Sequence, residues 1–583
     1  MGGGRIDSMK KWFLYGKKAD FDAIAKRFSI DPVTARILRN RELRTEEEID
    51  RYLNGRMEDR YSPLLLPDSI RCMNLLDRAV SEGRRIRIVG DYDVDGVCAT
   101  YILYTGLKKL GASVDYEIPD RIRDGYGINR SIIVRAKEEG ISLLLTCDNG
   151  ISAIEELRYA GELGIQVLVT DHHDVRQDEH GRDILPSAVA VVDAKRQGSR
   201  YPFPEICGAV VAWKVIELLY SKRNLPKESA AFALEFAAIA TVCDVVRLRD
   251  ENRIIVREGL RQILRTENRG LRALLQVTGL LEQEKLSAYH LGFQLGPCIN
   301  AGGRLESAKT ALRLFLSEDE AEASSYAVRL KELNEARKDM TREACERAYE
   351  QVEQRYREDR VLVISLPELH ESLAGIVAGR VRERYYRPSF VVTNAEPAED
   401  GSPMSKGSGR SIEDYPMAER LSEAAELLTK FGGHPLAAGF SLRTENLERF
   451  RQELNRLAKL SEEALQEKLW IDVPMPIDYI REELVQEWEK LEPYGAGNEK
   501  PLFACKGLRI LSVNVLGRNR NAVKLRLRSA GGRELPAMLF ADGDAFRQEL
   551  AGRSSMDIAY YPTIHEYQGR RELQLTISDY RLC

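Results

Sequence analysis

Two adjacent histidines end an apolar run in the segment VLVTDHHDV, Val167–Val175. The whole chain has seven histidines, and carboxylates flank this pair at Asp171 and Asp174. Imidazole and carboxylate together form a donor set that divalent metal ions accept. Taken alone, such a pair would more often cap a helix or make hydrogen bonds at the surface. The segment therefore predicts a metal site only if further donors join it.

Further donors of the right kind do stand at the ends of other apolar runs. These carboxylates are Asp91, Asp93, Asp95, Asp148 and Asp244. In an open parallel sheet, ligands bind beyond the carboxyl ends of the strands. We therefore expect the carboxylates to meet His172 and His173 at one edge of a sheet.

The combined donor set indicates a particular chemistry. Carboxylates a few Å apart cannot all stay ionised unless cations neutralise them. Without thiolates, carboxylate and imidazole suit Mn²⁺ or Mg²⁺, and Zn²⁺ less distinctively. Several carboxylates indicate two metals about 3.5–4 Å apart, an arrangement used in phosphoryl transfer. A calcium loop is the alternative for residues 91–96, but Ile102 stands where an EF-hand has its closing Glu.

The elements that must position these donors are short strands alternating with helices. Expected strands lie at 85–96, where the strand ends in carboxylates, and at 113–120, 142–150, 165–173 and 188–193. Expected helices lie at 96–111 and around 153–164. Strands that alternate with helices of about 10–15 residues predict βαβ units and a parallel sheet. The fold class is therefore α/β.

The rest of the chain divides into further segments. The stretch from Glu318 to Arg357 contains no Pro or Gly, which predicts one or two long, mostly solvated helices as a connector. The alternation of apolar and basic residues over 523–528 predicts a strand of a small β-barrel. The expected domains are a helical extension (1–60), a catalytic α/β domain (61–315), the connecting helix (316–358), a second α/β domain (359–460) and the barrel (465–583).

Charge and composition limit the kinds of partner. The formal net charge is −4, yet the stretch from Lys500 to Arg533 holds nine Lys or Arg and no Asp or Glu. Lys524, Arg526 and Arg528 would form one basic strand face that suits DNA phosphates. No apolar run approaches the ~20 residues of a membrane span, and no signal sequence is visible. We expect a cytoplasmic protein without membrane contact.

Aromatic side chains in the expected barrel have two alternative roles. Phe503, Tyr561 and Tyr567 can stack on nucleobases, at ~1–3 kcal/mol per base, or they can fill the barrel core. Tyr560 and Tyr561 are adjacent, so only one of them can face inward.

Several ordered motifs resemble those of a known superfamily. GDYDVDG (90–96), TCDNGI (146–151), TDHH (170–173) and TVCDVV (241–246) are similar to the motifs of the DHH phosphoesterases. Further motifs resemble the RecJ family within that superfamily, among them LGPCINAGGRL (295–305), GSGRSI (407–412) and FGGHPLAAGF (431–440). The resemblance implies a DHH domain, a connecting helix, a DHH-associated domain and a C-terminal OB-fold.

The resemblance also implies metal ligands and catalytic groups. The implied metal ligands are Asp93, Asp95, Asp148, His172 and Asp244, and Asp91 matches a further family carboxylate. His173 matches a histidine that lies against the substrate phosphate. Arg304 matches an arginine on the DNA backbone near the cut, and His434 resembles a histidine that faces the metals. For His434, a hydrogen bond at the entry of a helix is the alternative.

Other residues are implied as substrate contacts. Ser408 and Arg410 resemble residues that hold a terminal 5′-phosphate, with Arg121 beside them, and Asn300 belongs to the same motif as Arg304. Cys298 stands where the family usually has Arg, which puts one DNA contact in doubt.

The resemblance implies a metal-dependent 5′-to-3′ exonuclease that degrades single-stranded DNA to 5′-mononucleotides in DNA repair and recombination. Implied partners are single-stranded DNA, single-strand-binding protein and a RecQ-type helicase. One alternative is a small-substrate DHH enzyme, such as a nano-RNase, a cyclic-dinucleotide phosphodiesterase or a pyrophosphatase. The other alternative is a non-catalytic DHH-derived scaffold that binds DNA. The basic barrel disfavours the first, and the complete set of ligand positions disfavours the second.

Overall fold

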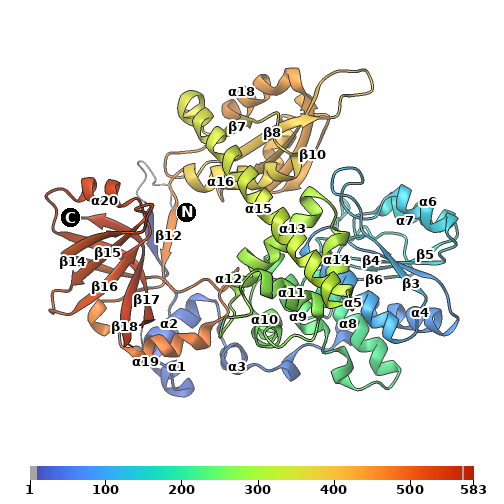
Figure 1. The fold of residues 1–583 in the computed structure, drawn as a ribbon, viewed down its shortest axis with the longest axis horizontal. Coiled ribbons are helices and arrows are strands. Elements are labelled where there is room, and N and C mark those ends of the chain that lie inside the picture. The colour runs from blue at the N-terminus through green and yellow to red at the C-terminus, as the bar shows by residue number, and fades with distance from the viewer. Residues whose placement is uncertain (1–9, 568–569) are drawn as a thin grey trace. The chain divides into compact units, whose positions relative to one another are not determined.

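The computed structural model of the protein describes residues 10–567 and 570–583. The chain folds into two compact units. Figure 1 shows the course of the chain and its helices and strands. The first unit comprises residues 46–338 and 492–499, and the second comprises the other described residues. Among the residues described, no helix is long and apolar enough to cross a membrane.

The first unit is built around a five-stranded sheet in which all strands are parallel. Its strands are β2 (Ile86–Val89), β3 (Val114–Glu117), β4 (Leu143–Cys147), β5 (Gln166–Thr170) and β6 (Ala190–Val192). The spatial order is β3-β2-β4-β5-β6, so the chain reverses its direction of progress between β2 and β4. Such a switch point is where ligands bind in open α/β sheets. The predicted parallel sheet is confirmed.

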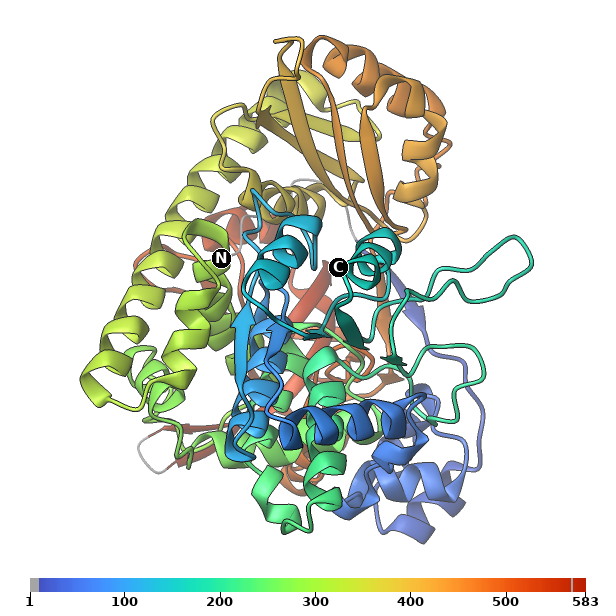
Figure 2. The same cartoon turned by 90° about the vertical axis from the view of Figure 1, so that its right-hand side faces the viewer.

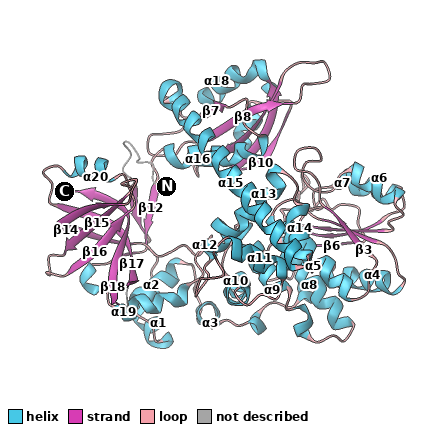
Figure 3. Ribbon diagram, in the orientation of Figure 1, coloured by secondary structure: helices cyan, strands magenta, loops and turns pink. Residues whose placement is uncertain are grey.

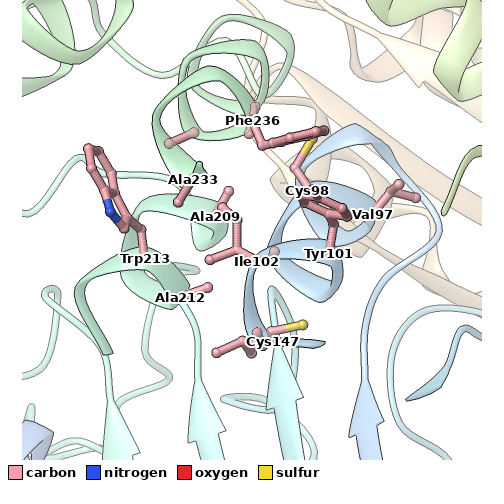
Figure 4. Packing of buried hydrophobic residues seen from close by; sticks show 14 of the residues in the cluster. Val97, Cys98, Tyr101, Ile102, Cys147, Ala209, Ala212, Trp213, Ala233 and Phe236 are labelled. Carbon is pink, nitrogen blue, oxygen red and sulfur yellow. The ribbon is translucent and has the colours of Figure 1, made fainter. Parts of the chain in front are cut away.

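Helices cover both faces of this sheet, because the strands are apolar on both sides. On one face lie α4 (Ser69–Ser81), α5 (Val94–Lys109), α8 (Gly208–Lys222) and α9 (Ala233–Cys243), and on the other lie α6 (Arg130–Glu138) and α7 (Ile154–Glu162). Figure 4 shows Cys147 of β4 beneath side chains of α5 and α8, with Phe236 of α9 above them. This packing fixes the ends of α5, α8 and α9 relative to the strands.

Irregular connections complete the first unit. The link between β5 and β6 contains only the isolated bridge between Gln177 and Asp183, and it projects from the unit as loops (Figure 2). Downstream lie α10 (Asp250–Ile263), α11 (Arg269–Val277), α12 (Ala288–His290), a π-helical turn (Leu291–Leu295), α13 (Gly296–Leu305) and α14 (Lys309–Leu316).

A single helix, α15 (Glu320–Gln351), runs for 32 residues, or about 48 Å. A π-helical turn, Val352–Tyr356, extends it. The predicted long helix therefore exists, and its lack of Pro and Gly explains its length.

The second unit contains a mixed sheet in the order β10-β11-β9-β8-β7. Strands β7, β8 and β10 are labelled among the magenta arrows of Figure 3. Its strands are β7 (Leu362–Ser365), β8 (Ser389–Ala395), β9 (Met404–Arg410), β10 (Lys430–His434) and β11 (Ala437–Arg443). Only β7 and β8 run parallel. Helix α16 (Glu371–Tyr385) packs on β8 and β9. The predicted second α/β fold is confirmed.

The C-terminal part forms a closed five-stranded barrel. Its strands are β14 (Phe503–Leu516), β15 (Ala522–Arg528), β16 (Glu534–Leu539), β17 (Ser555–Tyr567) and β18 (Arg570–Leu582), and pairing of β14 with β17 closes it. Val523, Leu525 and Leu527 point into the core. Their neighbours Lys524, Arg526 and Arg528 are exposed, as the alternation predicts.

The expected helical extension needs one correction. Besides helices α1 (Phe21–Phe28), α2 (Pro32–Asn40) and α3 (Glu46–Asn54), it contains a strand, β1 (Lys11–Leu14). This strand pairs in parallel with β12 (Lys468–Ile471). Four residues carry too little periodicity to predict a strand, and the partner is too distant in sequence to be visible.

Candidate metal centre

The predicted donors lie at the carboxyl edge of the parallel sheet and at the ends of two helices. Asp93 caps the N-terminus of α5, where its side chain accepts a 3.0 Å hydrogen bond from the Gly96 amide. Asp95 lies in the first turn of α5, and Asp244 is the C-terminal capping residue of α9. Asp148 follows β4 with a left-handed backbone (φ 60°), a strained conformation of the kind that clusters at functional sites.

Three overlapping groups of donors result, and within each group the ligand atoms lie within 4.8 Å of one another. The groups are Asp91, Asp93 and Asp148; Asp148, His172 and His173; and Asp95, His172 and Asp244. His172 Nε2 lies 3.0 Å from Asp148 Oδ1, 3.4 Å from Asp95 Oδ2 and 3.7 Å from Asp244 Oδ2. The structure therefore brings together all six predicted ligands and the second histidine.

Burial and like charges raise the pKa values of these carboxyls. Burial, followed by the charges of its neighbouring aspartates, holds the pKa of Asp148 well above its usual value. The same causes raise the pKa of Asp95 to about 6 and that of Asp244 to about 8. The amides of Gly208 and Ala209, at the start of α8, donate to Asp95 at 2.6 and 2.7 Å and oppose this effect.

The residues present fit divalent cations. Asp91 Oδ1 is buried and has no hydrogen-bond partner within the described structure. Burial lowers the pKa of His172 to about 3, so the imidazole is neutral and can offer a lone pair. Oxygen and imidazole donors without thiolate suit Mn²⁺ or Mg²⁺. Cations would remove the repulsion among the carboxylates.

Metal binding is therefore expected to stabilise the first unit. Adding Mn²⁺ to metal-free protein should raise its melting temperature, since free ion at 100 times Kd stabilises a folded site by ~2.7 kcal/mol. Calorimetry in EDTA and in Mn²⁺ measures this gain. The gain should be smaller in Asp244→Asn. A melting temperature that is the same with and without Mn²⁺ would contradict the proposed metal site.

Two residues hold the ring of His173. Its Nδ1 lies 2.8 Å from Asp171 Oδ1, and the Tyr126 hydroxyl lies 3.2 Å from the same nitrogen. Tyr126 also donates to the backbone carbonyl of Asp148 at 2.9 Å. Burial alone would lower the pKa of His173, but the hydrogen bond to Asp171 and nearby carboxylates raise it to about 9. The sequence analysis assigned no role to Tyr126, whose only signal is its place in the DGYGIN segment, 124–129.

Two of the predicted substrate groups lie around Tyr92, between the first two aspartates. The Arg121 guanidinium lies 3.8 Å from the Tyr92 ring centroid. Gly303, next to Arg304 in α13, approaches so closely that an added Cβ would lie 2.6 Å from the Tyr92 carbonyl oxygen. Asn300 Oδ1 is buried without a hydrogen-bond partner among the described residues. The Asn300 side-chain oxygen is therefore available for a hydrogen bond with a substrate.

Cys298 takes no part in this surface. Its side chain is buried, and its sulfur accepts a 3.3 Å hydrogen bond from Asn334 Nδ2 of α15. The thiol therefore joins α13 to α15 and presents no charge to a nucleic acid.

Two of the predicted 5′-phosphate residues, Ser408 and Arg410, lie together in the second unit, whereas Arg121 belongs to the first. Ser408 and Arg410 point to the same side of β9, with Arg410 Nη1 3.4 Å from Ser408 Oγ. Gly375 of α16 faces them, and an added Cβ would lie 2.9 Å from each of the two side chains. Burial and the charge of Arg382 lower the pKa of Arg410. Two arginines beside a hydroxyl, at a glycine that leaves room, suit a phosphate.

His434 lies at the exposed end of β10, opposite Ala437. The alternative of a hydrogen bond at a helix entry is wrong, because β11 follows after a turn. The Gly433 backbone next to it has φ 152°, a conformation that favours glycine over other residues.

The basic face of the barrel is weaker than its sequence suggests. Arg526 Nε lies 3.1 Å and Arg528 Nε 2.8 Å from the carboxylate of Glu534, one residue beyond the basic tract. Arg520, within the same basic tract, pairs with Asp544, which offsets its charge. Among Lys524, Arg526 and Arg528, Lys524 alone makes no salt bridge within the described residues.

The aromatic residues of the barrel divide between core and surface. Phe503 is fully buried, and its ring centroid lies 4.7 Å from that of Trp488 in a stacked arrangement. Of its two alternative roles, filling the core is therefore the one that the structure shows. Tyr560 faces inward, and Tyr561 is half-buried with Lys500 Nζ 3.8 Å from its ring centroid. The side chain of Tyr567 lies outside the described residues.

Comparisons with known families match three parts of the chain. Residues 85–241 match the N-terminal domain of the DHH family, 358–460 the DHHA1 domain, and 471–579 the RecJ OB domain. The single-stranded-DNA-specific exonuclease RecJ of Bacillus subtilis is 34% identical over 577 residues, covering 98% of this chain and 71% of the relative.

Solved structures agree with this match. The crystal structure of RecJ from Thermus thermophilus in complex with Mn²⁺ aligns with a TM-score of 0.82 at 28% identity, covering 98% of this chain and 79% of that one. The complex of the same protein with Mg²⁺ aligns with a TM-score of 0.77 at 26% identity, covering 98% and 78%. With identity above 30% across nearly the whole sequence, this chain belongs to the RecJ family of DHH phosphoesterases.

Proposed function

We propose that the protein is a metal-dependent exonuclease that degrades single-stranded DNA from the 5′ end and releases 5′-mononucleotides. The observation that carries this proposal is the set of three donor groups linked by Asp148 and His172. Their residues are the ones expected to hold two divalent cations: Asp91, Asp93, Asp95, Asp148, His172 and Asp244. When bound, Mn²⁺ or Mg²⁺ activates water and stabilises a leaving oxygen in phosphoryl transfer.

His173 has the role of a proton-bearing donor to the phosphate. Asp171 accepts from Nδ1 and keeps the ring protonated, so Nε2–H is available to a phosphoryl oxygen. The Tyr126 hydroxyl, 3.2 Å from the same nitrogen, also restrains the ring. Such a fixed donor stabilises charge that develops on the phosphoryl group.

Arginines orient the strand in this proposal. Arg304, with Asn300 on the same helix, contacts the backbone next to the scissile bond through a guanidinium fork that matches phosphate geometry. Ser408 and Arg410 bind the terminal 5′-phosphate, with Arg121 as a further contact, and His434 acts on the substrate from β10. Lys524, Arg526 and Arg528 of the barrel bind the strand beyond the reacting end.

The alternatives lack comparable support. A small-substrate phosphodiesterase would not need the barrel, which is present here and similar to the RecJ OB domain. A non-catalytic scaffold would not need a complete donor set. We also propose the domain division 1–60, 61–315, 316–358, 359–460 and 465–583. A role in DNA repair and recombination, a cytoplasmic location and contacts with single-strand-binding protein or a RecQ-type helicase are part of the same proposal.

End-resolved digestion tests the activity. Single-stranded DNA labelled internally and at the 3′ end, with and without a 5′-phosphate, is incubated with the full chain in Mn²⁺ or Mg²⁺. We expect progressive release of mononucleotides from the 5′ end, faster with the 5′-phosphate and absent in Asp148→Ala. Cutting confined to oligomers of a few nucleotides would move the protein to the small-substrate class. Equal binding without cutting in both proteins would leave only the scaffold.

A further inference from the structure

Two aromatic side chains of the first unit are stacked on each other at the surface. Tyr289 in α12 and Phe293 in the following π-helical turn are 60% and 67% exposed. Their ring centroids lie 5.0 Å apart, with an angle of 22° between the planes. Large apolar rings that stay in water contribute little to the stability of the fold. Exposed apolar groups of this kind often mark a binding site.

The π-helical turn that exposes Phe293 contacts the end of α9, next to the expected metal ligand Asp244. Leu291 and Leu295 of this turn are fully buried, while Phe293 between them points outward. The Cys243 thiol, one residue before Asp244, donates to the Leu291 carbonyl at 3.6 Å. π-Helical turns carry a backbone cost and occur frequently at functional sites.

The chain is also strained beside Asp244. Val245 adopts a left-handed backbone with φ 60° and is 69% exposed. A β-branched residue in this conformation is a genuine outlier, and such strain concentrates at functional sites. Two segments that contact each other next to Asp244 therefore both present apolar side chains to solvent at a cost in folding energy.

The size of the aromatic pair limits what can cover it. Two rings of this exposure offer at most about 300 Å², whereas a stable protein interface buries about 800 Å² on each partner. A flat nucleobase, by contrast, needs only one ring face, and stacking on aromatic rings is the usual way in which proteins hold single-stranded bases. The dimensions favour a base over a protein.

Helix α13 connects this pair to the reacting end of the substrate. From Phe293 to Arg304 the helical chain advances eleven residues, or about 16 Å. That length exceeds the spacing of adjacent nucleotides, about 3.4 Å when bases are stacked. When the 5′ end of a strand is at the metal centre, the base that reaches the aromatic pair therefore belongs to a nucleotide several positions toward the 3′ end.

We propose that Tyr289 and Phe293 form a stacking platform for a base of single-stranded DNA, several nucleotides to the 3′ side of the cut. This inference rests on the proposed exonuclease function and assigns a substrate subsite to it. Because every base has an aromatic face, the platform selects unpaired DNA of sufficient length and not a sequence. A dinucleotide cannot reach it.

Steady-state kinetics on two substrate lengths test the platform. For Phe293→Leu, which keeps an apolar side chain but removes the ring, we expect KM for a 20-mer to rise roughly 5- to 160-fold, the range for loss of one stacked base. KM for a dinucleotide should stay as in the wild type. Phe293→Trp should restore the 20-mer KM, and Leu225→Ala is the matched control, since it removes an exposed apolar side chain elsewhere in the same unit.

A fluorescence measurement locates the base directly. 2-Aminopurine is placed at successive positions of a 20-mer bound to the Asp148→Ala full-length protein. Quenching at an internal position, lost in Asp148→Ala/Phe293→Leu, is the expected result. Equal KM values for wild type and Phe293→Leu on the 20-mer, or equal loss on both lengths, would overturn the platform. A wild-type protein that cuts no single-stranded DNA would instead overturn the proposed function.

Discussion

Replacing Asp148 by asparagine is expected to lower kcat/KM on single-stranded DNA by more than ~1000-fold and to raise the melting temperature of the metal-free protein. Asp148 belongs to two of the three donor groups and lies 3.0 Å from His172 Nε2. Its loss would remove a carboxylate from two donor groups at once, a larger deficit than the ~100- to 1000-fold cost of losing one preorganised donor. Activity should therefore fall below detection in a progress assay.

The rise in stability has a separate cause. In the metal-free protein, burial and the neighbouring aspartates destabilise the Asp148 carboxylate. Asparagine has nearly the same shape without the charge, so the variant should melt about 2–4 °C higher in EDTA, the shift for ~1 kcal/mol. Opposite signs for activity and stability are typical of residues retained for function.

Asp174→Asn is the matched control for Asp148→Asn. Asp174 flanks the histidine pair in sequence but is exposed and pairs with Lys195 at 2.9 Å. Its replacement should change the melting temperature little. An Asp148→Asn protein that retained wild-type kcat/KM would refute the metal site, and one that melted lower in EDTA would refute the charge argument.

Replacing Lys214 by methionine should cause the largest loss of stability. Lys214 in α8 and Glu251 in α10 are fully buried, with 3.0 Å between Nζ and Oε2. Lys214 Nζ also donates to the Tyr61 carbonyl at 2.8 Å, and the Tyr201 hydroxyl donates to Glu251. Removing one partner of a buried ion pair leaves an uncompensated charge and costs ~3–5 kcal/mol.

The same change should weaken metal binding, because the amides at the start of α8 bind Asp95. Denaturant unfolding with and without Mn²⁺ measures both effects. Lys222→Met serves as the control on the same helix, since Lys222 is exposed and pairs with Asp77 at 3.5 Å, a contact worth under ~1 kcal/mol. A loss for Lys214→Met no larger than for Lys222→Met would contradict the argument. Adding Glu251→Gln should recover part of the stability, because it removes the unpaired carboxylate.

The sequence predicted those features that depend on local pattern. The apolar runs before Asp91, Asp148 and Asp171 end at strand termini, so the parallel sheet and its carboxyl edge could be read directly. The regular alternation of 523–528 likewise gave the correct inward and outward faces. Periodicity identifies such elements because it records which side of the backbone is buried.

Features that depend on distant pairing were not predictable. Tyr126 meets Asp148 and His173 through a loop whose course leaves no periodic signal. The barrel arginines lose charge to Glu534 only because β15 and β16 bring Arg528 opposite it. Phe503 is buried because it meets Trp488, and nothing in its neighbouring residues distinguishes that position from a surface one.

The pairing of β1 with β12 has a consequence for synthesis of the chain. Lys11 also meets Glu463, 452 residues later, so the first strand has no partner until most of the chain exists. At roughly 5–20 residues per second, a ribosome needs about 20–90 seconds to reach that point. During this interval the apolar segment of Trp12, Phe13 and Leu14 remains an unpaired edge. Residues 11–14 thus reach their final place long after they are made.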